Sequence, residues 1–211
     1  MMIQPDRIDG HPILRTDHKC DHWVFILLPI FDEANRLRRT AVEMMRHLAM
    51  MGVGCCLPDL PSQGENDFYI HDLTWKYLSE CAAQLAASAC PDGAQLHVAS
   101  FRNAALFDHQ IKAQSHWRMS PQSLPDLRRS MRHNTYNLQI FGEHFLQSME
   151  DKTCPHPQRL RSVFLASEGV AGAPCVTGPP IWLWAEPGDA PSLTKALAED
   201  LHRWVTTCAN S

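Results

Sequence analysis

The sequence predicts an α/β protein built on a mostly parallel sheet. Short apolar runs, each closed by a turn signal, are separated by amphipathic stretches of helical length. Strands and helices that alternate in this way form parallel strands joined by right-handed crossovers, with helices on both faces of the sheet. The chain has 211 residues and is 45% hydrophobic, which is enough for one domain with a sizeable core. We therefore expect a single domain over residues 1–211.

The first half of the chain contains the clearest elements. An apolar run at residues 23–28 (WVFILL), closed by a proline, predicts a buried strand. Residues 36–51 predict a helix, because apolar residues recur there at three- and four-residue spacing and a glycine follows. Residues 53–57 (VGCCL) predict a second strand that leads into the turn-rich loop 58–64. A helix at 70–89, a strand at 96–99 and a helix at 103–114 complete the alternation.

The second half is less regular. Its expected elements are a loop at 116–125, one or two helices within 127–149, strands at 160–166 and 181–185, and a closing helix at about 192–206. The segment 116–150 could form a helical cap inserted over the sheet. Only one or two later strands fit between residues 109 and 175, so we expect a shortened second half.

The composition excludes several classes of protein. A formal net charge of −4 and a pI near 6.3 argue against a nucleic-acid coat and a polybasic membrane binder. The longest apolar run, residues 23–31, is far shorter than the roughly 20 residues of a membrane helix. No basic and then apolar leader opens the chain, and eight scattered cysteines without a C-x-x-C pair predict free thiols. We expect a cytoplasmic protein with no cofactor, no nucleic-acid partner and no membrane span.

The run from Phe25 to Leu85 resembles the opening of an α/β-hydrolase. In that fold a strand leads to an oxyanion loop, a helix follows, and the next strand ends in D-x-P-x-x-G, which residues 58–65 (PDLPSQGE) match. The stretch 29–36 (PIFDEANR) resembles the P-P-F-x-E-E-x-N-K/R stretch of bacterial exosortase A system-associated hydrolases of the isoform 2 type. Residues 178–182 (GPPIW) are similar to a G-P-P-F-W stretch of those proteins.

The resemblance covers residues 23–108 and, less closely, 178–200. It implies an α/β-hydrolase-like fold with helices on both faces of the sheet. It also implies a link to exopolysaccharide and PEP-CTERM protein-sorting gene clusters.

The expected nucleophile turn of such a fold lies after the strand at 96–99. The nucleophile of G-x-S-x-G stands on a sharp turn between small flanking residues. With Ser100 at the apex the flanking residues are Val98 and Arg102, and neither is small. With Arg102 at the apex they are Ser100 and Ala104, which are both small, and a helix follows at once. The second register is favoured. The resemblance to the exosortase-associated proteins supports it, since those proteins also carry arginine at this position, in a G-L-R-L-G stretch.

An arginine at this turn changes the chemistry. It stays protonated and cannot attack a carbonyl. Beside the backbone N–H groups of Asn103 and Ala104 its guanidinium would form an anion pocket. Alternatively, Arg102 pairs with a nearby carboxylate such as Asp59 or Asp108.

The other parts of a catalytic triad are not evident. The histidine of the fold follows the last strand, where residues 178–182 offer none, and His202 lies inside the closing helix. The acid could be Glu186 or Asp189, although Asp189 is equally explained as a helix cap. The resemblance thus comes with a degenerate triad. If Ser100 were the nucleophile, the base would be His109, His116 or His133, with the oxyanion loop at Ile30 and Phe31.

Three further patterns offer sites. His18, Cys20 and His22 alternate as zinc ligands would on a strand, but no matching pair completes the set, so we expect an exposed strand end and no metal. Trp182 and Trp184 alternate and predict core packing or a sugar-stacking platform. Basic residues concentrate at Lys112, His116, Arg118, Arg128, Arg129, Arg132 and His133, as either a solvated helix face or an attractant for an anionic chain.

These observations favour a non-catalytic binding or accessory protein in exopolysaccharide or surface-protein export. Its ligand would be a small anionic molecule or an anionic glycan or lipid-linked group, bound at the turn around Arg102. The alternative is a working serine hydrolase of an ester, thioester or amide. A third possibility is a structural subunit that uses the fold only as an interaction surface.

Overall fold

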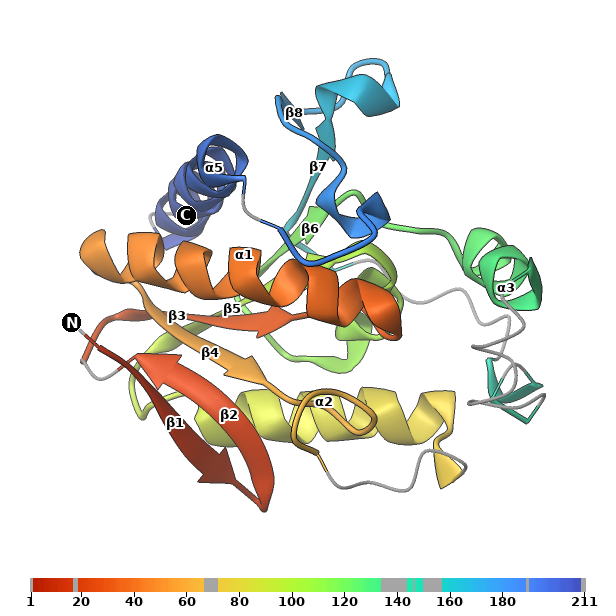
Figure 1. The fold of residues 1–211 in the computed structure, drawn as a ribbon. Coiled ribbons are helices and arrows are strands. Elements are labelled where there is room, and N and C mark those ends of the chain that lie inside the picture. Colours follow the sequence, from red (N-terminus) through yellow and green to blue (C-terminus); the bar gives the residue numbers. More distant parts are fainter. Residues whose placement is uncertain are drawn as a thin grey trace.

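The computed structural model describes residues 2–16, 19–66, 72–133, 144–145, 147–149, 157–188 and 190–209. Within these residues a twisted eight-stranded sheet has α1 (Asp32–Met50) and α5 (Pro191–Ala209) on one face and α2 (Trp75–Ala89) on the other (Figure 1). A shorter helix, α3 (Leu124–His133), follows the sixth strand. No helix in the described part of the chain is long and apolar enough to cross a membrane.

The strands lie in the order β1-β2-β4-β3-β5-β6-β7-β8. Their bounds are β1 Ile3–Ile8, β2 His11–Thr16, β3 His22–Leu27, β4 Gly54–Pro58, β5 Gln95–Phe101, β6 Ser115–Met119, β7 Leu160–Leu165 and β8 Cys175–Val176. Pairing is antiparallel between β1 and β2 and between β2 and β4, and parallel in every other described pair. The mostly parallel sheet is therefore confirmed. Parallel strands end at one edge, so the turns after β3, β5 and β6 meet there.

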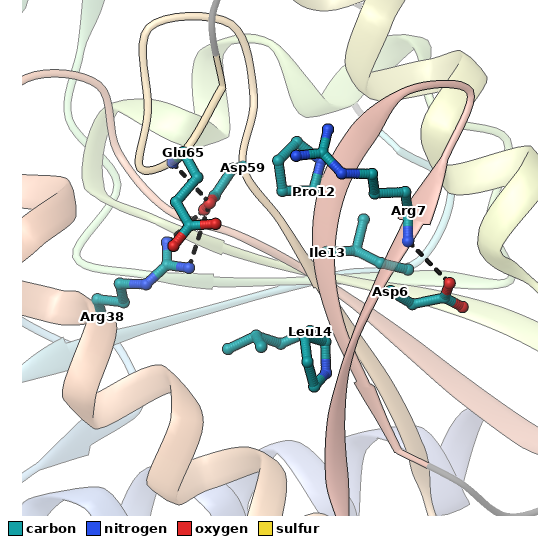
Figure 2. Close-up of a pocket in the computed structure, with 9 residues that line it drawn as sticks. Asp6, Arg7, Pro12, Ile13, Leu14, Arg38, Asp59 and Glu65 are labelled. Carbon is teal, nitrogen blue, oxygen red and sulfur yellow. Dashed lines mark hydrogen bonds and ion pairs between the residues drawn. The ribbon is translucent and has the colours of Figure 1, made fainter.

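The loop after β4 explains the fixed residues of the D-x-P-x-x-G pattern. The buried Asp59 carboxylate binds the Arg38 guanidinium of α1 through both oxygens and accepts from the Glu65 backbone N–H at 3.0 Å (Figure 2). Gly64 has a φ of +52°, and a Cβ at this position would lie 2.3 Å from a carboxylate oxygen of Asp59. Residue 64 must therefore lack a side chain if the carboxylate is to close the loop.

The same loop fixes the turn between β3 and α1. The Gln63 side-chain amide donates to the carbonyl oxygens of Pro29 at 2.8 Å and Leu28 at 3.3 Å. Ile30 and Phe31 follow directly in this turn, and Phe31 has a φ of 68°. The loop thus positions the segment that the α/β-hydrolase resemblance identifies as the oxyanion loop.

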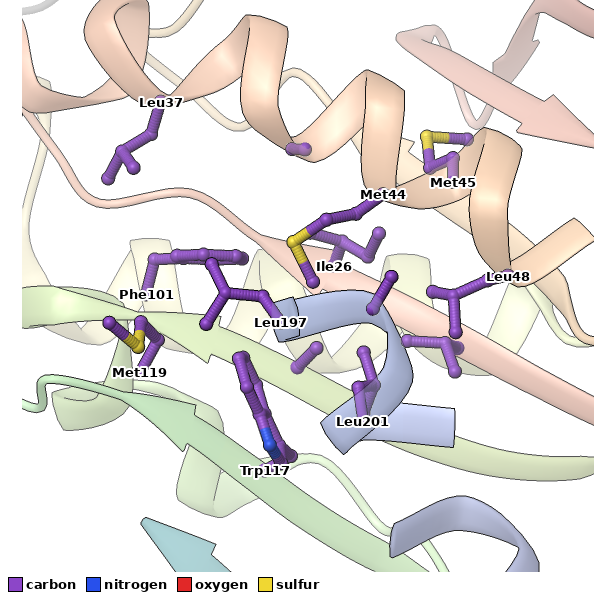
Figure 3. Packing of buried hydrophobic residues seen from close by; sticks show 14 of the residues in the cluster. Ile26, Leu37, Met44, Met45, Leu48, Phe101, Trp117, Met119, Leu197 and Leu201 are labelled. Atoms are coloured by element: carbon purple, nitrogen blue, oxygen red, sulfur yellow. The ribbon is translucent and has the colours of Figure 1, made fainter. Parts of the chain in front are cut away.

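Two hydrophobic clusters cover the faces of the sheet. Ile26 of β3 points toward α1 and α5, whereas Phe25 points toward α2, because successive residues of a strand alternate between faces. Figure 3 shows the first cluster, where Met44 of α1 and Leu197 of α5 lie near Ile26 and Trp117. Burial on both faces explains why these strands read as continuous apolar runs.

Buried carboxylates also tie the helices to the sheet. Asp200 of α5 accepts from the Trp117 indole N–H at 2.8 Å and from the Arg161 guanidinium at 2.9 and 2.6 Å. Burial raises the pKa of Asp200, but the hydrogen bonds from Arg161 and Trp117 outweigh it, so the pKa lies below its ordinary value. The ionised carboxylate therefore holds α5 against β6 and β7.

The N-terminal hairpin is an element that the sequence analysis does not predict. β1 is an edge strand with exposed Pro5, Asp6 and Arg7, so it lacks the apolar run of a buried strand. The turn is Asp9-Gly10, with φ values of 51° and 84°. An Asp-Gly pair is the favoured sequence for a two-residue hairpin turn, and this was the usable signal.

Two predicted segments between β5 and α3 are wrong. Instead of a helix at 103–114, the chain forms two 3₁₀ turns, η2 (Arg102–Leu106) and η3 (Asp108–Gln110). Residues 115–119 form β6 and not part of a loop at 116–125. The reason is the ion pair between Asp108 and Arg118. It holds the Asp108 carboxylate in the core, and it places the polar Arg118 inside β6, where the sequence alone suggests an exposed residue.

The predicted strand at 181–185 is also wrong. Ile181–Leu183 form a 3₁₀ turn (η5), in which Leu183 N donates to Pro180 O at 2.9 Å and Trp184 N donates to Ile181 O at 3.2 Å. Leu183 is 69% exposed, so the run of apolar residues does not enter the sheet. β8 instead lies upstream, and its two residues are too short a strand to be detected from the sequence. The predicted cap at 116–150 falls partly outside the described residues, and its described part includes β6 and α3.

We expect Gly64→Ala to destabilise the protein more than Gly93→Ala. Both glycines have a positive φ, which alone costs about 1 kcal/mol on substitution. Only at Gly64 does the added Cβ meet the Asp59 carboxylate, whereas nothing lies within 4 Å at Gly93. Urea denaturation of the two variants should separate these costs. Equal destabilisation would show that the Asp59 carboxylate does not need the space at Gly64.

Stability should also fall as the pH drops from about 6.5 to about 4. His97 of β5 is fully buried, with Nδ1 2.8 Å from Ser115 Oγ and Nε2 3.3 Å from His22 Nδ1. Burial, with neighbouring His22 and His116, lowers the pKa of His97 to about 4. The unfolded chain therefore binds the extra proton first, and stability is lost by up to about 1.4 kcal/mol per pH unit in this window. His97→Gln should flatten that slope in urea denaturation, and an unchanged slope would contradict the assignment.

Candidate functional site

The candidate site is built around the turn after β5. Arg102 follows the strand with a φ of 55°. A residue other than glycine is uncommon in this left-handed region, which costs about 1–2 kcal/mol. The structure therefore has, at Arg102, the strained strand-to-turn geometry that a nucleophile elbow uses. Ala104, two residues on, is fully buried, whereas Ser100 lies inside β5 opposite Leu27 of β3.

The Arg102 side chain is held by three partners from three other parts of the chain. Its Nε lies 3.2 Å from Glu33 Oε2 at the start of α1, and its Nη1 donates to the Ser120 carbonyl O at 3.1 Å after β6. The guanidinium carbon lies 4.7 Å from the ring centroid of Trp182 in η5, a cation–π contact. Arg102 pairs with Glu33, not with Asp59 or Asp108, which bind Arg38 and Arg118 instead.

Glu33 is placed by the start of α1, whose first turn carries two acidic residues, Asp32 and Glu33. Acidic side chains are favourable there because the helix dipole is positive at its N-terminus. The Glu33 side chain is only 22% exposed. Burial raises the pKa of Glu33, although the charge and hydrogen bond of Arg102 oppose this. Glu33 is thus the carboxylate that forms the ion pair with Arg102.

The oxyanion loop already has a hydrogen-bond partner from the protein. In α/β-hydrolases the hole is formed by the backbone N–H after the nucleophile and an N–H from the loop after the equivalent of β3. Here the Ile30 N–H donates to Asn103 Oδ1 at 2.9 Å, and Asn103 is 2% exposed. The Asn103 side chain therefore occupies the donor that a substrate oxyanion would need at Ile30.

Ser100 belongs to a buried network of its own. Its hydroxyl donates to Asp108 Oδ2 at 2.7 Å, and Asp108 forms a two-bond pair with the Arg118 guanidinium at 3.0 and 2.6 Å. Both Ser100 and Asp108 are fully buried. The Ser100 hydroxyl thus donates its hydrogen bond to a carboxylate that is already paired, and no described histidine hydrogen-bonds to this hydroxyl.

Neither His109 nor His116 hydrogen-bonds to Arg102 or to Ser100 in the described structure. His109 lies in η3 with Nδ1 3.1 Å from Leu106 O, and His116 has Nε2 3.3 Å from Asp108 O. His202 lies on α5. The segment 177–190 between β8 and α5 contains no histidine. The His133 side chain and Asp189 lie outside the described part of the structure, and Glu186 is exposed.

Glu168 is a site residue that the sequence analysis misses. It ends the 3₁₀ turn η4 (Ala166–Glu168) after β7, and its Oε2 accepts from Ser120 Oγ at 2.5 Å and from Leu165 N at 2.7 Å. Ser120, with a φ of 44°, in turn accepts from Arg102 through its carbonyl. The available sequence signal was an acidic residue, Glu168, shortly after the predicted strand at 160–166. The carboxyl end of this strand lies at the same edge of the sheet as residue 102.

A cavity of about 110 Å³ lies beside this cluster, between the start of α1 and α3. Asp32, Glu33 and Arg36 line it together with Asn103 and Gln122, so both signs of charge face it. A larger hollow of about 460 Å³ lies elsewhere, between the β1–β2 hairpin and the Asp59 loop (Figure 2). The small cavity adjoins the turn, and it offers polar groups for a ligand's charged end.

The basic concentration predicted in the second half is divided by the fold. Arg118 is paired with buried Asp108 and His116 is buried, whereas Arg129 and Arg132 lie exposed on α3. Lys112 lies exposed near the start of β6. The seven residues therefore form neither one helix face nor one continuous patch.

The two remaining patterns have different outcomes. Trp182 is 4% exposed and packs in the core and on Arg102, while Trp184 packs at the edge of that cluster; with the predicted strand absent, the two do not share one strand face. His18 lies outside the described residues. Within the described part of the chain no group of three potential ligands could hold a metal ion.

Comparisons with known proteins concern the fold. No protein-family model and no curated protein matches the sequence. Est1E from Butyrivibrio proteoclasticus, solved with ferulic acid bound, has 14% identity and a TM-score of 0.59, with 99% of this chain and 100% of that chain covered. XC6422 from Xanthomonas campestris, a serine hydrolase without a lid, has 12% identity and a TM-score of 0.56, with 97% and 94% covered. The chain therefore has the α/β-hydrolase fold.

Arg102→Ala should destabilise the protein by about 2–4 kcal/mol, because it removes the Trp182 contact and leaves the Glu33 carboxylate unpaired in a mostly buried place. Adding Glu33→Gln to that variant should recover part of the loss, since the uncompensated charge is gone. Urea denaturation of the single and double variants measures this. A double variant no more stable than Arg102→Ala would show that the ion pair is not what the cluster depends on.

Proposed function

We propose that this protein is a non-catalytic binding or accessory protein that uses the α/β-hydrolase fold to bind an anionic ligand at the Arg102 turn. The observation that carries the proposal is the residue at the strained turn itself. A guanidinium stays protonated in proteins and has no lone pair to attack a carbonyl. It is a strong partner for carboxylates and phosphates.

The surroundings of the turn support the same proposal. The Ile30 N–H is bound by Asn103, the Ser100 hydroxyl is bound by Asp108, and the segment between β8 and α5 has no histidine. A nucleophile, a base and an oxyanion donor must be placed together for acyl transfer. At this turn the described residues place neither a free nucleophile nor a base, and the Ile30 donor is already bound.

The anion that Arg102 binds in the structure is a side chain of the protein, the Glu33 carboxylate. A ligand carboxylate or phosphate would take the place of Glu33 on the guanidinium. Burial raises the pKa of Glu33 and the charge of Arg102 opposes this, so a ligand anion that takes over the guanidinium while Glu33 stays buried would favour the protonated form of Glu33. Anion binding is therefore expected to be coupled to proton uptake and to strengthen as the pH falls toward the pKa of Glu33.

We further propose the biological setting that the sequence resemblance implies. Residues 29–36 and 178–182 resemble exosortase A system-associated hydrolases, and this resemblance supports a role in exopolysaccharide or PEP-CTERM protein export. An acidic polysaccharide or a phosphorylated lipid carrier would supply the anion. The seven cysteines in the described part of the chain are free thiols, which fits a cytoplasmic location.

A fluorophosphonate probe tests the non-catalytic reading. We expect no labelling of the wild type, of Ser100→Ala or of Arg102→Ala, because Arg102 stands at the turn and the Ser100 hydroxyl donates to Asp108 and not to a histidine. Labelling of the wild type that is lost only in Ser100→Ala would overturn the proposal and establish a serine hydrolase, an activity that the names of the structural neighbours also suggest. An active α/β-hydrolase, labelled in parallel, controls for the probe.

Ligand binding is tested by calorimetry with oligogalacturonate and with farnesyl diphosphate as probes. At least one should bind the wild type, with binding lost in Arg102→Ala. Glu33→Gln should bind several-fold more tightly, since the competing carboxylate is removed while the side chain keeps its shape. The proposal fails if neither probe binds, or if Arg102→Ala binds as well as the wild type.

A further inference from the structure

A second charged hollow lies at the opposite end of the strands from Arg102. β6 and β7 are parallel neighbours, and the His116 N–H donates to the Arg159 carbonyl O at 2.8 Å where the two strands begin. The segment before β6 and the segment before β7 line a cavity of about 350 Å³ at this edge. Small-molecule sites are typically about 300–1,000 Å³, so the space is enough for one small ligand.

Cationic and potentially cationic groups dominate the polar lining. Lys112, Arg159, His109 and His116 all face this cavity, and no described lining residue is a carboxylate. No ion pair forms to Lys112 or Arg159 within the part of the chain that the structure describes. This differs from the Arg102 turn, where Glu33 already balances the guanidinium.

One of the cations is held in position. Arg159 Nη1 donates to the carbonyl O of Cys208 near the end of α5 at 2.7 Å, and Gln114 Nε2 donates to the same oxygen at 3.3 Å. The guanidinium has five N–H donors, so this one bond leaves others for a ligand. Lys112 is exposed and lines the cavity, so its ammonium is accessible to a ligand from solvent.

His116 supplies the observation that points to a ligand. It is 3% exposed, and its Nε2 lies 3.3 Å from the Asp108 carbonyl O. A carbonyl oxygen only accepts, so Nε2 carries the hydrogen and Nδ1 of the neutral ring is left with a lone pair. Nδ1 is buried and has no hydrogen-bond partner. An unsatisfied buried nitrogen costs about 1–3 kcal/mol, which a bound group with a hydroxyl or an acidic oxygen would recover.

We propose that this cavity binds a phosphate monoester of a small polar molecule. A phosphate has a second pKa near 6, so it can donate a hydrogen bond to neutral His116 Nδ1 or accept one from the protonated ring. Its remaining oxygens match the Arg159 fork and the Lys112 ammonium. This site does not depend on the function proposed for Arg102.

The test is calorimetric titration with ribose 5-phosphate and with inorganic phosphate. Ribose 5-phosphate should bind the wild type, and Lys112→Gln should weaken it about tenfold, the loss expected for one charged hydrogen bond. The matched control is Lys76→Gln on α2, whose lysine side chain is 80% exposed and does not line the cavity, and it should bind like the wild type. Lys112→Arg should retain most of the affinity.

Four results would overturn the proposal. Failure of ribose 5-phosphate to bind, or binding of inorganic phosphate alone, would contradict a monoester ligand. Equal affinities of Lys112→Gln and Lys76→Gln would contradict binding in this cavity. Binding lost in Arg102→Ala and kept in Lys112→Gln would assign the phosphate to the turn after β5 instead.

Discussion

The ion pair between Arg102 and Glu33 is the contact on which the candidate site depends. It joins the turn after β5 to the first turn of α1, and the same guanidinium reaches Ser120 after β6 and Trp182 before α5. Four segments that are far apart in the sequence therefore meet on one side chain. The position that is strained in the backbone, with a φ of 55°, is stabilised by the side chain that it carries.

Pairs of arginine and a buried carboxylate recur throughout the sheet. Asp59, Asp108 and Asp200 each hold an arginine from a neighbouring element, and each is no more than 4% exposed. Such pairs add little net stability but are costly to break on one side. They therefore specify one arrangement of loops and helices, since any other packing would leave an unpaired charge in the core.

The sequence predicts the fold where one physical signal dominates. The apolar runs of β3 and β4 and the helical spacing of α1 were sufficient, because hydrophobic burial alone determines those elements. The prediction of a helix at 103–114 failed, because the contact of Asp108 with Arg118 is long-range and has no local pattern. The apolar run at 181–185 misled for a similar reason, since Trp182 is buried by a guanidinium from another segment.

The same division holds for the site. Small residues at 100 and 104 favoured Arg102 as the apex of a turn, and Arg102 has a φ of 55°. Neither Glu33 nor Glu168 could be assigned to it, because their approach depends on where α1 begins and where β7 ends.

The bond between Asn103 and Ile30 has a consequence for the history of the fold. A serine at 102 would still face an occupied oxyanion donor, and a histidine would have to arise separately in the segment before α5. Replacing Arg102 with serine would also leave Glu33 and Trp182 without the guanidinium that they contact. Replacing Arg102 alone would thus lower stability before any hydrolytic activity could arise.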